Sequence, residues 1–551
     1  MFHFANVWEA IADATPDRPA IVQSDRTVLW KDFDDRSARL AGCYLAHGLG
    51  TDSKVAIFLY NSAEYLESQY AAFKVRCSPV NVNYRYLEDE LAYLLDNADC
   101  EAVVFHASLG ERIARIRHKL PKLKLLLQVR DHEAPDAPLV EGALEYDSAI
   151  AAATPAPRQT RDENDVYMLY TGGTTGMPKG VMYPTGGFAQ ALTKLTSDNM
   201  GRPPFADLDD LLGTVKGMAA MNFQLKSMPC CPLMHGTGVW LGAFATHLTG
   251  GCVVLMETRG LDCDEMFDTI EREKVNSIVI VGDAFARPML KTLRDRAAAG
   301  KTWDLSSLLA IISSGAMFSA EIKQGLFEFI PQMRIVDTLG SSEGAMGTNV
   351  ATKDAAIETA KFKLSESVKV FDENDEEVAA GSGVIGRVAT SAKALGVLSL
   401  GYYKDEEKTA KTFREVAGVK YSFPGDMAMV EADGSITLLG RGSNCINTGG
   451  EKVFPEEVEE AVKTHPLVAD CLVFGITDER FGQRVVGVAS AIDLDGDLQA
   501  DIVIAHTKTV LSSYKTPRQL VLVPEVPRAP NGKADYKRAR ELFLLVHPEG
   551  V

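Results

Sequence analysis

The sequence predicts an α/β protein in which a large N-terminal domain of α/β subdomains and a β-subdomain precedes a small α+β domain. Three observations support this prediction. Short apolar runs alternate with helical patterns through the first part of the chain, hairpin signals replace them after about Glu343, and glycine and serine gather at 440–445. A chain of 551 residues is also too long for one hydrophobic core, so two or more domains are expected.

The first part of the chain is expected to form parallel sheets with helices on both faces. Helices are predicted over 37–45, 63–74 and 88–97. Short buried strands are predicted at 55–59, 78–82, 102–105, 251–256, 277–281, 308–313 and 334–337. Such an alternation of helix and strand is typical of parallel α/β architecture.

The later part is expected to change to antiparallel pairing. Turn signals at 372–375 and 432–435 predict hairpins. The final elements are predicted as helices over 455–462 and 500–511 and strands over 468–474 and 484–492. We therefore expect one domain over 1–442 and a second over 443–551.

The composition excludes several classes of protein. The 57 Lys and Arg residues against 75 Asp and Glu give a net charge of −18, which argues against nucleic acid as a partner because phosphate backbones need a basic face. No apolar run approaches the roughly 18–20 residues of a membrane span, and the N-terminus lacks the features of a secretory signal. The nine cysteines include no C-x-x-C pair, so we expect reduced cysteines in a cytoplasmic protein without a structural metal.

The most specific local pattern runs from Tyr170 to Gly180. It holds four glycines, three threonines and one lysine directly after an apolar run. Glycine permits a close backbone approach, and successive N–H groups form a concave anion site, so the natural guest is a polyphosphate such as that of ATP. The pattern differs from the usual P-loop, which ends in Gly-Lys-Ser/Thr. A flexible linker is the alternative, but linkers rarely carry a Pro-Lys pair with a strand immediately upstream.

Two carboxylates follow predicted strands or turns. Glu343 ends the run Leu339–Glu343 after a buried strand, where it is either solvated surface or a Mg²⁺ ligand at the sheet edge. Asp426 follows a Pro-Gly turn and either caps that turn or accepts the hydroxyls of a ribose. Arg441 is either a surface charge or a second contact to the nucleotide. The residues alone leave these alternatives open.

Three further candidates are weaker on their own. His235 lies among apolar residues, where a core histidine is the simpler interpretation. The run Asn447–Glu459 has glycines that either start a helix or let a flat backbone line a tunnel. Lys533 lies in a turn near the C-terminus, where a lysine nearly always faces solvent.

Together and in this order, these motifs resemble those of the adenylate-forming acyl-CoA synthetases, which are related to luciferase and to peptide-synthetase adenylation domains. The resemblance covers the chain essentially from end to end, and six motifs in the family's order make it specific. The runs Val281–Pro288, Ser341–Glu343 and Gly449–Val453 look most like those of bacterial fatty-acid and steroid-side-chain CoA ligases.

The resemblance implies a two-step reaction that uses ATP, Mg²⁺ and coenzyme A. A carboxylate attacks the α-phosphorus of ATP to give acyl-AMP and pyrophosphate, and the thiol of coenzyme A then displaces AMP. The resemblance makes Lys533 the catalytic lysine and Glu343 the Mg²⁺ ligand. It makes His235 a second catalytic residue, which flanks the acyl pocket and helps to position the substrate. The phosphate- and nucleotide-binding residues that it implies are Thr171, Gly172, Gly173, Thr174, Thr175, Gly176, Lys179, Gly315, Ala316, Asp337, Ser342, Asp426 and Arg441. It also implies that the small domain is mobile and that Gly449 and Gly450 line the coenzyme A tunnel after it rotates.

Three positions depart from the family's pattern. Leu339 stands where most members have an aromatic residue that stacks on adenine, and Gly172 replaces a serine of the phosphate loop. Asn444, preceded by Ser443, replaces the usual hinge aspartate. Two alternatives to a CoA ligase therefore stay open, namely an acyl-AMP ligase that loads a carrier protein and a non-catalytic acyl-adenylate binding protein.

The acyl group is expected to be large and apolar. The segment 196–225 is rich in Met, Phe and Gly, and the small residues Gly344, Ala345 and Gly347 leave space after Glu343. We therefore expect a medium- or long-chain fatty acid or a bulky alicyclic acid such as a steroid side-chain acid, with aryl acids as the alternative. Family members include dimers, so a homodimer is also left open.

Overall fold

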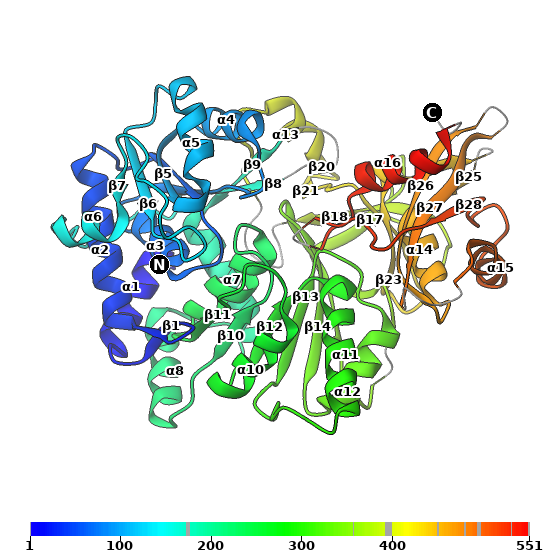
Figure 1. The fold of residues 1–551 in the computed structure, drawn as a ribbon, viewed down its shortest axis with the longest axis horizontal. Coiled ribbons are helices and arrows are strands. Elements are labelled where there is room, and N and C mark those ends of the chain that lie inside the picture. Colours follow the sequence, from blue (N-terminus) through cyan, green and yellow to red (C-terminus); the bar gives the residue numbers. More distant parts are fainter. Residues whose placement is uncertain are drawn as a thin grey trace.

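The computed structural model confirms the predicted α/β fold with one large and one small domain. It describes residues 2–171, 177–355, 358–391, 399–448, 451–478, 481–492, 498–529 and 532–548. The large N-terminal lobe runs from blue to yellow in Figure 1, and the small C-terminal domain, orange to red, lies to one side of it.

The first sheet of the lobe has the strand order β19-β9-β8-β4-β3-β5-β6-β7. Its strands are β3 (Lys54–Phe58), β4 (Ser78–Asn81), β5 (Cys100–His106), β6 (Leu125–Val129), β7 (Leu144–Glu145), β8 (Val166–Thr171), β9 (Lys179–Pro184) and β19 (Gly401–Tyr402). The central strands are parallel, short and buried, as expected for strands covered on both faces by helices. The neighbouring helices are α1 (Phe4–Ala14), α2 (Trp30–Ala46), α3 (Ala63–Lys74), α4 (Glu88–Asn97), α5 (Gly110–Ile116) and α6 (Tyr146–Ala152).

The second sheet is parallel in its first half. Its strands there are β1 (Pro19–Gln23), β10 (Lys226–Pro229), β11 (Cys252–Leu255), β12 (Ser277–Ile280), β13 (Ala310–Ser314) and β14 (Arg334–Ser341), with β2 (Arg26–Leu29) antiparallel at the edge. Helices of this half are α7 (Thr185–Asn199), α8 (Leu208–Ala220), α9 (Ala245–His247), α10 (Cys263–Glu273), α11 (Gly282–Ala298) and α12 (Ala320–Phe329).

The same sheet continues into the β-subdomain instead of ending before it. The pairing becomes antiparallel at β15 (Gly344–Ala351), which returns along β14. The remaining strands are β16 (Lys361–Leu364), β17 (Val368–Phe371), β18 (Ile385–Ser391), β20 (Phe413–Val416), β21 (Val419–Ser422), β22 (Asp426–Val430) and β23 (Ile436–Arg441). The predicted hairpin at 432–435 joins β22 to β23, where Gly434 has a φ of +79° and the Asp433 carboxylate accepts from the N–H of Ser435.

The C-terminal domain is a separate α+β unit with its own core. Its strands are β24 (Ile446–Thr448), β25 (Glu451–Val453), β26 (Val468–Asp478), β27 (Gly482–Ala491) and β28 (Gln519–Leu522). Its helices are α14 (Pro455–Lys463), α15 (Ala500–Val510) and α16 (Tyr536–Val546). The predicted boundary after Gly442 falls in the short turn of helix Gly442–Asn444.

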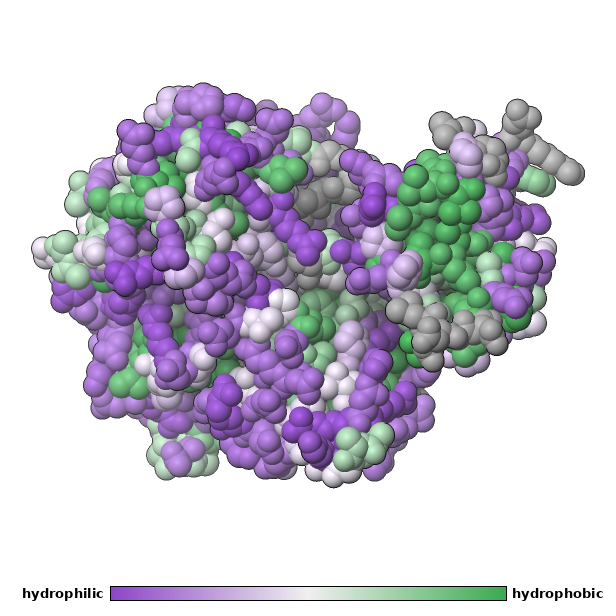
Figure 2. Space-filling model, viewed as in Figure 1, coloured by the Kyte–Doolittle hydropathy of each residue, from purple (hydrophilic) through white to green (hydrophobic). Residues whose placement is uncertain are grey.

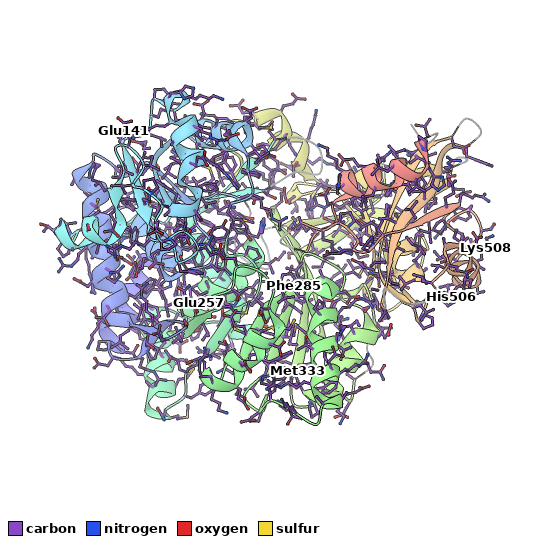
Figure 3. All side chains as sticks on the ribbon, viewed as in Figure 1. Glu141, Glu257, Phe285, Met333, His506 and Lys508 are labelled. Carbon is purple, nitrogen blue, oxygen red and sulfur yellow. The ribbon has the colours of Figure 1, made fainter. Side chains whose placement is uncertain are left out.

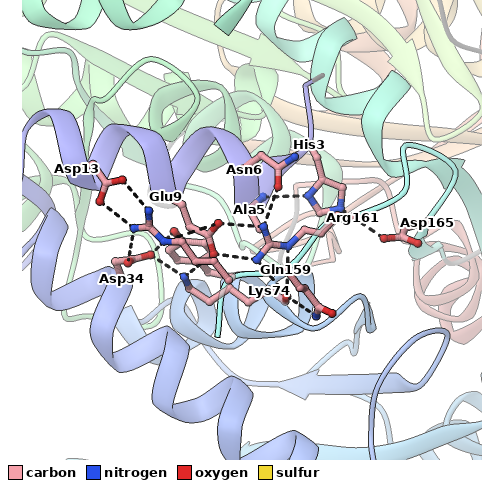
Figure 4. Close-up of polar contacts among 12 residues, drawn as sticks. His3, Ala5, Asn6, Glu9, Asp13, Asp34, Lys74, Gln159, Arg161 and Asp165 are labelled. Atoms are coloured by element: carbon pink, nitrogen blue, oxygen red, sulfur yellow. Dashed lines mark hydrogen bonds and ion pairs between the residues drawn. The ribbon is translucent and has the colours of Figure 1, made fainter. Parts of the chain in front are cut away.

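A buried network of charges fixes the N-terminal helix to the lobe (Figure 4). Arg161 donates to Glu9 of α1 at 2.8 and 2.9 Å, and Lys74 of α3 donates to Glu9 at 3.0 Å and to Asp34 of α2 at 2.6 Å. Removing one member of this network would leave a buried charge without a partner. The network therefore holds α1, α2 and α3 together.

The surface in Figure 2 is mostly hydrophilic, in keeping with the high content of charged residues. A green apolar patch over α16 and the strands beside it is the main exception in this view, and Leu545 and Val546 of α16 are exposed. Within the described ranges, no helix has both the length and the apolar character that a membrane crossing would demand.

Candidate active site

A cavity of about 420 Å³ opens where strands of both sheets of the lobe end. Its wall includes Thr171 at the end of β8, Gly315 after β13, and Ser342 and Glu343 after β14. The carboxyl ends of parallel strands are where ligands gather in α/β proteins. The structure therefore brings these predicted residues together, and His235 and Lys533 lie in the same wall.

Lys533 reaches the cavity from the C-terminal domain. Gly532 packs so closely on α11 that a Cβ there would lie 2.9 Å from the Cβ of Ala284, and its φ of +71° also favours glycine. Phe285, the next residue of α11, is labelled near the centre of Figure 3. The Lys533 Cε lies 3.8 Å from the point where a Cβ on Gly315 would be. Lys533 is thus a neighbour of the β13 end, and its exposed side chain faces the open cavity.

The charge of Lys533 is tuned by groups of the lobe. Loss of solvation and the nearby Arg441 guanidinium lower its pKa, whereas the Glu343 and Asp426 carboxylates act in the opposite direction. The Lys533 ammonium is attracted by Glu343 and Asp426 and repelled by Arg441. It is therefore suited to bind the oxygens of an anionic ligand in place of these carboxylates.

His235 is held as a neutral ring. Burial, and secondarily the charge of Lys533, lower its pKa to about 3. It lies just before η3 (Thr237–Phe244), a π-helix whose residue Val239 donates its N–H to the His235 carbonyl at 3.0 Å. π-Helical segments are rare in proteins and are frequently found at functional sites.

Glu343 lies in the turn between β14 and β15. Its Oε1 accepts a hydrogen bond of 2.7 Å from the hydroxyl of Tyr402, and the Tyr183 hydroxyl donates to the carbonyl of Ser342. In the described part of the chain, no group of three or more His, Cys, Asp or Glu side chains could hold a metal by itself. A single carboxylate fits Mg²⁺, which takes most of its ligands from phosphate oxygens and water.

Asp426 and Arg441 lie opposite each other on β22 and β23, with 3.7 Å between the Arg441 Nε and the Asp426 Oδ1. Burial raises the pKa of Asp426, and Arg441 opposes this shift. The buried Oδ2 of Asp426 has no hydrogen-bond partner among the described residues. Since buried carboxylate oxygens are normally bonded, this atom is a candidate acceptor for a ligand hydroxyl.

Lys179 lies at the start of β9 and pairs with Asp405 at 3.0 Å. Lys408 of α13 (Glu406–Thr412) is the other cation close to it. The sequence analysis missed this group and Tyr402, although the run Gly401–Lys408, with its two tyrosines and two lysines, is a local signal that could have indicated it.

The apolar side of the cavity is formed mainly by α7 and η3. The lining residues there are Phe188, Ala191, Leu192, Leu195, Trp240 and Leu241. The Trp240 indole N–H donates to the Tyr167 hydroxyl at 2.8 Å, which fixes the indole against the wall. The prediction that Gly344, Ala345 and Gly347 border the pocket is confirmed. The prediction for 196–225 is wrong for most of that segment, because Leu211 and Val215 of α8 pack into the core with α1 and only Asp198 lines the cavity.

Several predicted residues lie elsewhere. The Asp337 carboxylate is buried and accepts from the Lys323 ammonium at 2.9 Å, so its side chain is turned to α12 and not to the cavity. Ala316 packs at the edge of the core around β12 and β13. Leu339 is buried in the core of the β-subdomain. The predictions for Gly172, Gly173, Thr174, Thr175, Gly176, Gly449 and Gly450 lie outside the described residues.

Comparison with known families and proteins finds matches along most of the chain. Residues 8–403 match the family model described as AMP-binding enzyme, and residues 457–533 match that of the AMP-binding enzyme C-terminal domain. A medium/long-chain-fatty-acid–CoA/3-oxocholest-4-en-26-oate–CoA ligase of Mycolicibacterium smegmatis is 39% identical over 546 residues, 98% of this chain and 96% of the relative. A 3-oxocholest-4-en-26-oate–CoA ligase of Rhodococcus rhodochrous is 38% identical over 544 residues, 98% and 95% of the two chains.

Solved structures share the fold over nearly the full length. The anthranilate CoA ligase AuaEII in complex with anthranoyl-AMP has a TM-score of 0.83 at 20% identity, covering 99% of this chain and 98% of that one. ATP-bound MatB from Rhodopseudomonas palustris has a TM-score of 0.78 at 22% identity, covering 98% and 99%. At these identities the likeness shows the fold alone.

Proposed function

We propose that this chain, which belongs to the AMP-binding enzyme family, is an ATP-dependent ligase that converts a hydrophobic carboxylic acid through acyl-AMP to its CoA thioester. The observation that carries the proposal is the convergence of Lys533 and Glu343 in one cavity with an apolar wall. A cation from the small domain and a carboxylate from the sheet edge meet where an acid and a nucleotide would have to react.

The first step joins two anions. An oxygen of the substrate carboxylate attacks the α-phosphorus of ATP, and the bond from that phosphorus to pyrophosphate breaks. Lys533 holds the carboxylate and the α-phosphate together and stabilises the charge that develops, a contribution on the order of 3–4 kcal/mol for one such group. His235 borders the carboxylate as a neutral ring and adds no charge that would compete with Lys533.

The nucleotide is held by residues of the cavity wall and by the pair Asp426 and Arg441, which lies outside the lining but acts on the charge of Lys533. The free Oδ2 of Asp426 accepts from a ribose hydroxyl, with Arg441 beside it, and Gly315 lies at the adenine side. Glu343 is the residue that would hold Mg²⁺, which when bound neutralises phosphate charge. In the second step the sulfur of coenzyme A loses its proton to solvent and attacks the acyl carbon, and AMP leaves with the bonding electrons of the C–O bond.

The acid is a medium- or long-chain fatty acid or a steroid side-chain acid. The apolar wall of α7 and η3 supports this assignment, and so do the names of the relatives from Mycolicibacterium smegmatis and Rhodococcus rhodochrous. Mg²⁺ as the metal, a cytoplasmic location and assembly as a monomer or homodimer are proposals that rest on the family resemblance. Chelation of Mg²⁺ tests the metal, and light scattering of the purified chain tests the oligomeric state.

A panel of carboxylates tests the function. The purified chain is incubated with ATP, Mg²⁺ and CoA, and AMP and acyl-CoA are both measured for acetate, octanoate, palmitate, benzoate and a steroid side-chain acid. We expect AMP and acyl-CoA in equal amounts from the long or bulky acids. Pyrophosphate exchange without acyl-CoA would favour the carrier-protein alternative, and no turnover with any acid would favour the non-catalytic one.

A further inference from the structure

The segment after β19 places a second lysine beside Lys179. β19 pairs antiparallel with β9, so that Tyr402 lies opposite Val181. Asp405 then caps α13 by accepting the N–H of Lys408 at 3.0 Å, which fixes the backbone from which the Lys408 side chain extends. The first sheet therefore positions Lys408 next to the strand that begins with Lys179.

Both ammonium groups gather around the same aromatic ring. The Nζ of Lys179 lies 5.9 Å and that of Lys408 5.2 Å from the centre of the Tyr402 ring. The Tyr402 hydroxyl in turn binds Glu343 at 2.7 Å. One tyrosine thus links the carboxylate of the cavity to two cations.

The charges of this cluster are unbalanced. Asp405 pairs with Lys179, but no carboxylate in the described part of the chain lies within 4.0 Å of the Lys408 ammonium. Burial and the neighbouring Lys179 lower the pKa of Lys408, and Glu343 and Asp405 only partly oppose this. The protein as a whole has a net charge of −18, but here two cations lie side by side and repel each other. An anion bound between them would remove this repulsion.

An anion that fits this place carries more than one negative charge, because it faces two ammonium groups. It also extends towards Glu343, the carboxylate that would hold the metal. A phosphate chain meets both conditions, because its oxygens bind ammonium groups, and Glu343 would hold a Mg²⁺ ion that neutralises further phosphate charge. We propose that Lys408 binds the β- and γ-phosphates together with Lys179 and stabilises the pyrophosphate that leaves in the first step. This inference rests on the proposed function and assigns Lys408 a direct contact with the leaving group.

The test measures pyrophosphate itself. Lys408→Gln removes the charge, and Lys411→Gln is the matched control, because Lys411 lies on the same helix but is exposed and paired with Glu407 at 2.6 Å. The assay is ATP–pyrophosphate exchange with a fixed saturating acid. We expect Lys408→Gln to raise the KM for pyrophosphate about tenfold, Lys411→Gln to leave it unchanged, and Lys408→Arg to restore most of the loss.

A second readout separates this role from a structural one. Supplied acyl-AMP and CoA react without pyrophosphate, so the rate of this half-reaction should be equal in the wild type and Lys408→Gln. A loss of both half-reactions, or an unchanged KM for pyrophosphate in a folded variant, would overturn the role of Lys408 while leaving the ligase function intact. If the wild type gave neither exchange nor AMP, the proposed function itself would fail.

Discussion

At the scale of single residues, a few charged groups in and near the cavity shift one another's pKa values. The Lys533 charge helps to keep His235 neutral, and Arg441 lowers the pKa of Lys533. Glu343 and Asp426 favour the protonated ammonium. Each of these charges depends on the others, so a ligand that replaces one of them as a partner changes the pKa values of the rest.

Asp426→Ala should remove the preference for ribose over deoxyribose. The wild type is expected to use ATP about tenfold better than 2′-deoxy-ATP in kcat/KM for AMP release, because a site built to bind a hydroxyl discriminates against its absence. The buried, unpartnered Oδ2 of Asp426 is the acceptor invoked. Asp433→Ala, in the exposed turn of the same hairpin, is the control that should keep the preference. An Asp426→Ala enzyme that still favours ATP to the full extent would contradict the assignment.

At the scale of elements, α7 and η3 form the apolar wall of the cavity, which we propose binds the acyl group. Phe188 of α7 and Trp240 of η3 lie with ring centres 4.9 Å apart, and the Tyr167 hydroxyl fixes the indole. The wall is therefore preorganised, and its size is set by residues on one face of α7.

Ala191→Phe should shorten the space for the acyl group. Ala191 is a buried lining residue, so a phenyl ring there would fill the cavity, and kcat/KM for palmitate is expected to fall at least about tenfold while that for hexanoate changes little. Gln190→Phe, on the exposed side of the same helix, is the control. Equal losses for both acids would show that α7 does not set chain length.

Local patterns predicted much of this architecture. The buried strands and the hairpin at 432–435 were predictable because apolar runs and turn residues act over a few positions. The start of α2 at Trp30, the helix α16 and the continuity of the second sheet into the β-subdomain were missed, since tertiary packing decides them. The buried pair of Asp337 with Lys323 and the acyl wall on α7 depend on which way side chains point, which spacing alone did not indicate.

At the scale of the whole molecule, the C-terminal domain docks on the lobe through a buried carboxylate. Glu456 of α14 lies against β23, where a Cβ on Gly440 would be 2.1 Å from its Oε2. Burial raises its pKa to about 7, and Asp426 adds to the shift, whereas the N–H groups of Glu456 and Arg441 and the Asn444 amide oppose it. Asn444, which replaces the hinge aspartate of the family, thus adds no negative charge beside this group.

Docking should weaken as pH rises. An unperturbed glutamate has a pKa of 4.5, whereas the pKa of docked Glu456 is about 7. Below pH 4.5 Glu456 is protonated in both states, and docking is fully favoured. Between pH 4.5 and pH 7 the undocked carboxyl ionises first, so the docked state loses stability as pH rises. The raised pKa of Asp426, which belongs to the lobe, acts in the same direction. His235, Lys533 and Arg441 are unchanged in Glu456→Gln, so the difference between this variant and the wild type isolates Glu456.

Energy transfer between fluorescent labels on the two domains measures the docked fraction at each pH. Glu141 and Lys508, labelled at opposite sides of Figure 3, are exposed sites for cysteines in a Cys445→Ser background, where the other native cysteines are buried. We expect the docked fraction of the wild type to fall between pH 5 and pH 7 and that of Glu456→Gln to change less. Identical profiles for the two proteins would refute the role of Glu456.

The two half-reactions of Lys533→Ala test most directly whether one lysine from the small domain drives the first step. We expect acyl-AMP formation to fall about 10²–10³-fold, whereas CoA thioester formation from supplied acyl-AMP stays close to that of the wild type. Lys537→Ala, an exposed lysine four residues further on, should leave both rates unchanged. An equal loss of both half-reactions in Lys533→Ala, or full acyl-AMP formation without this ammonium, would contradict the mechanism.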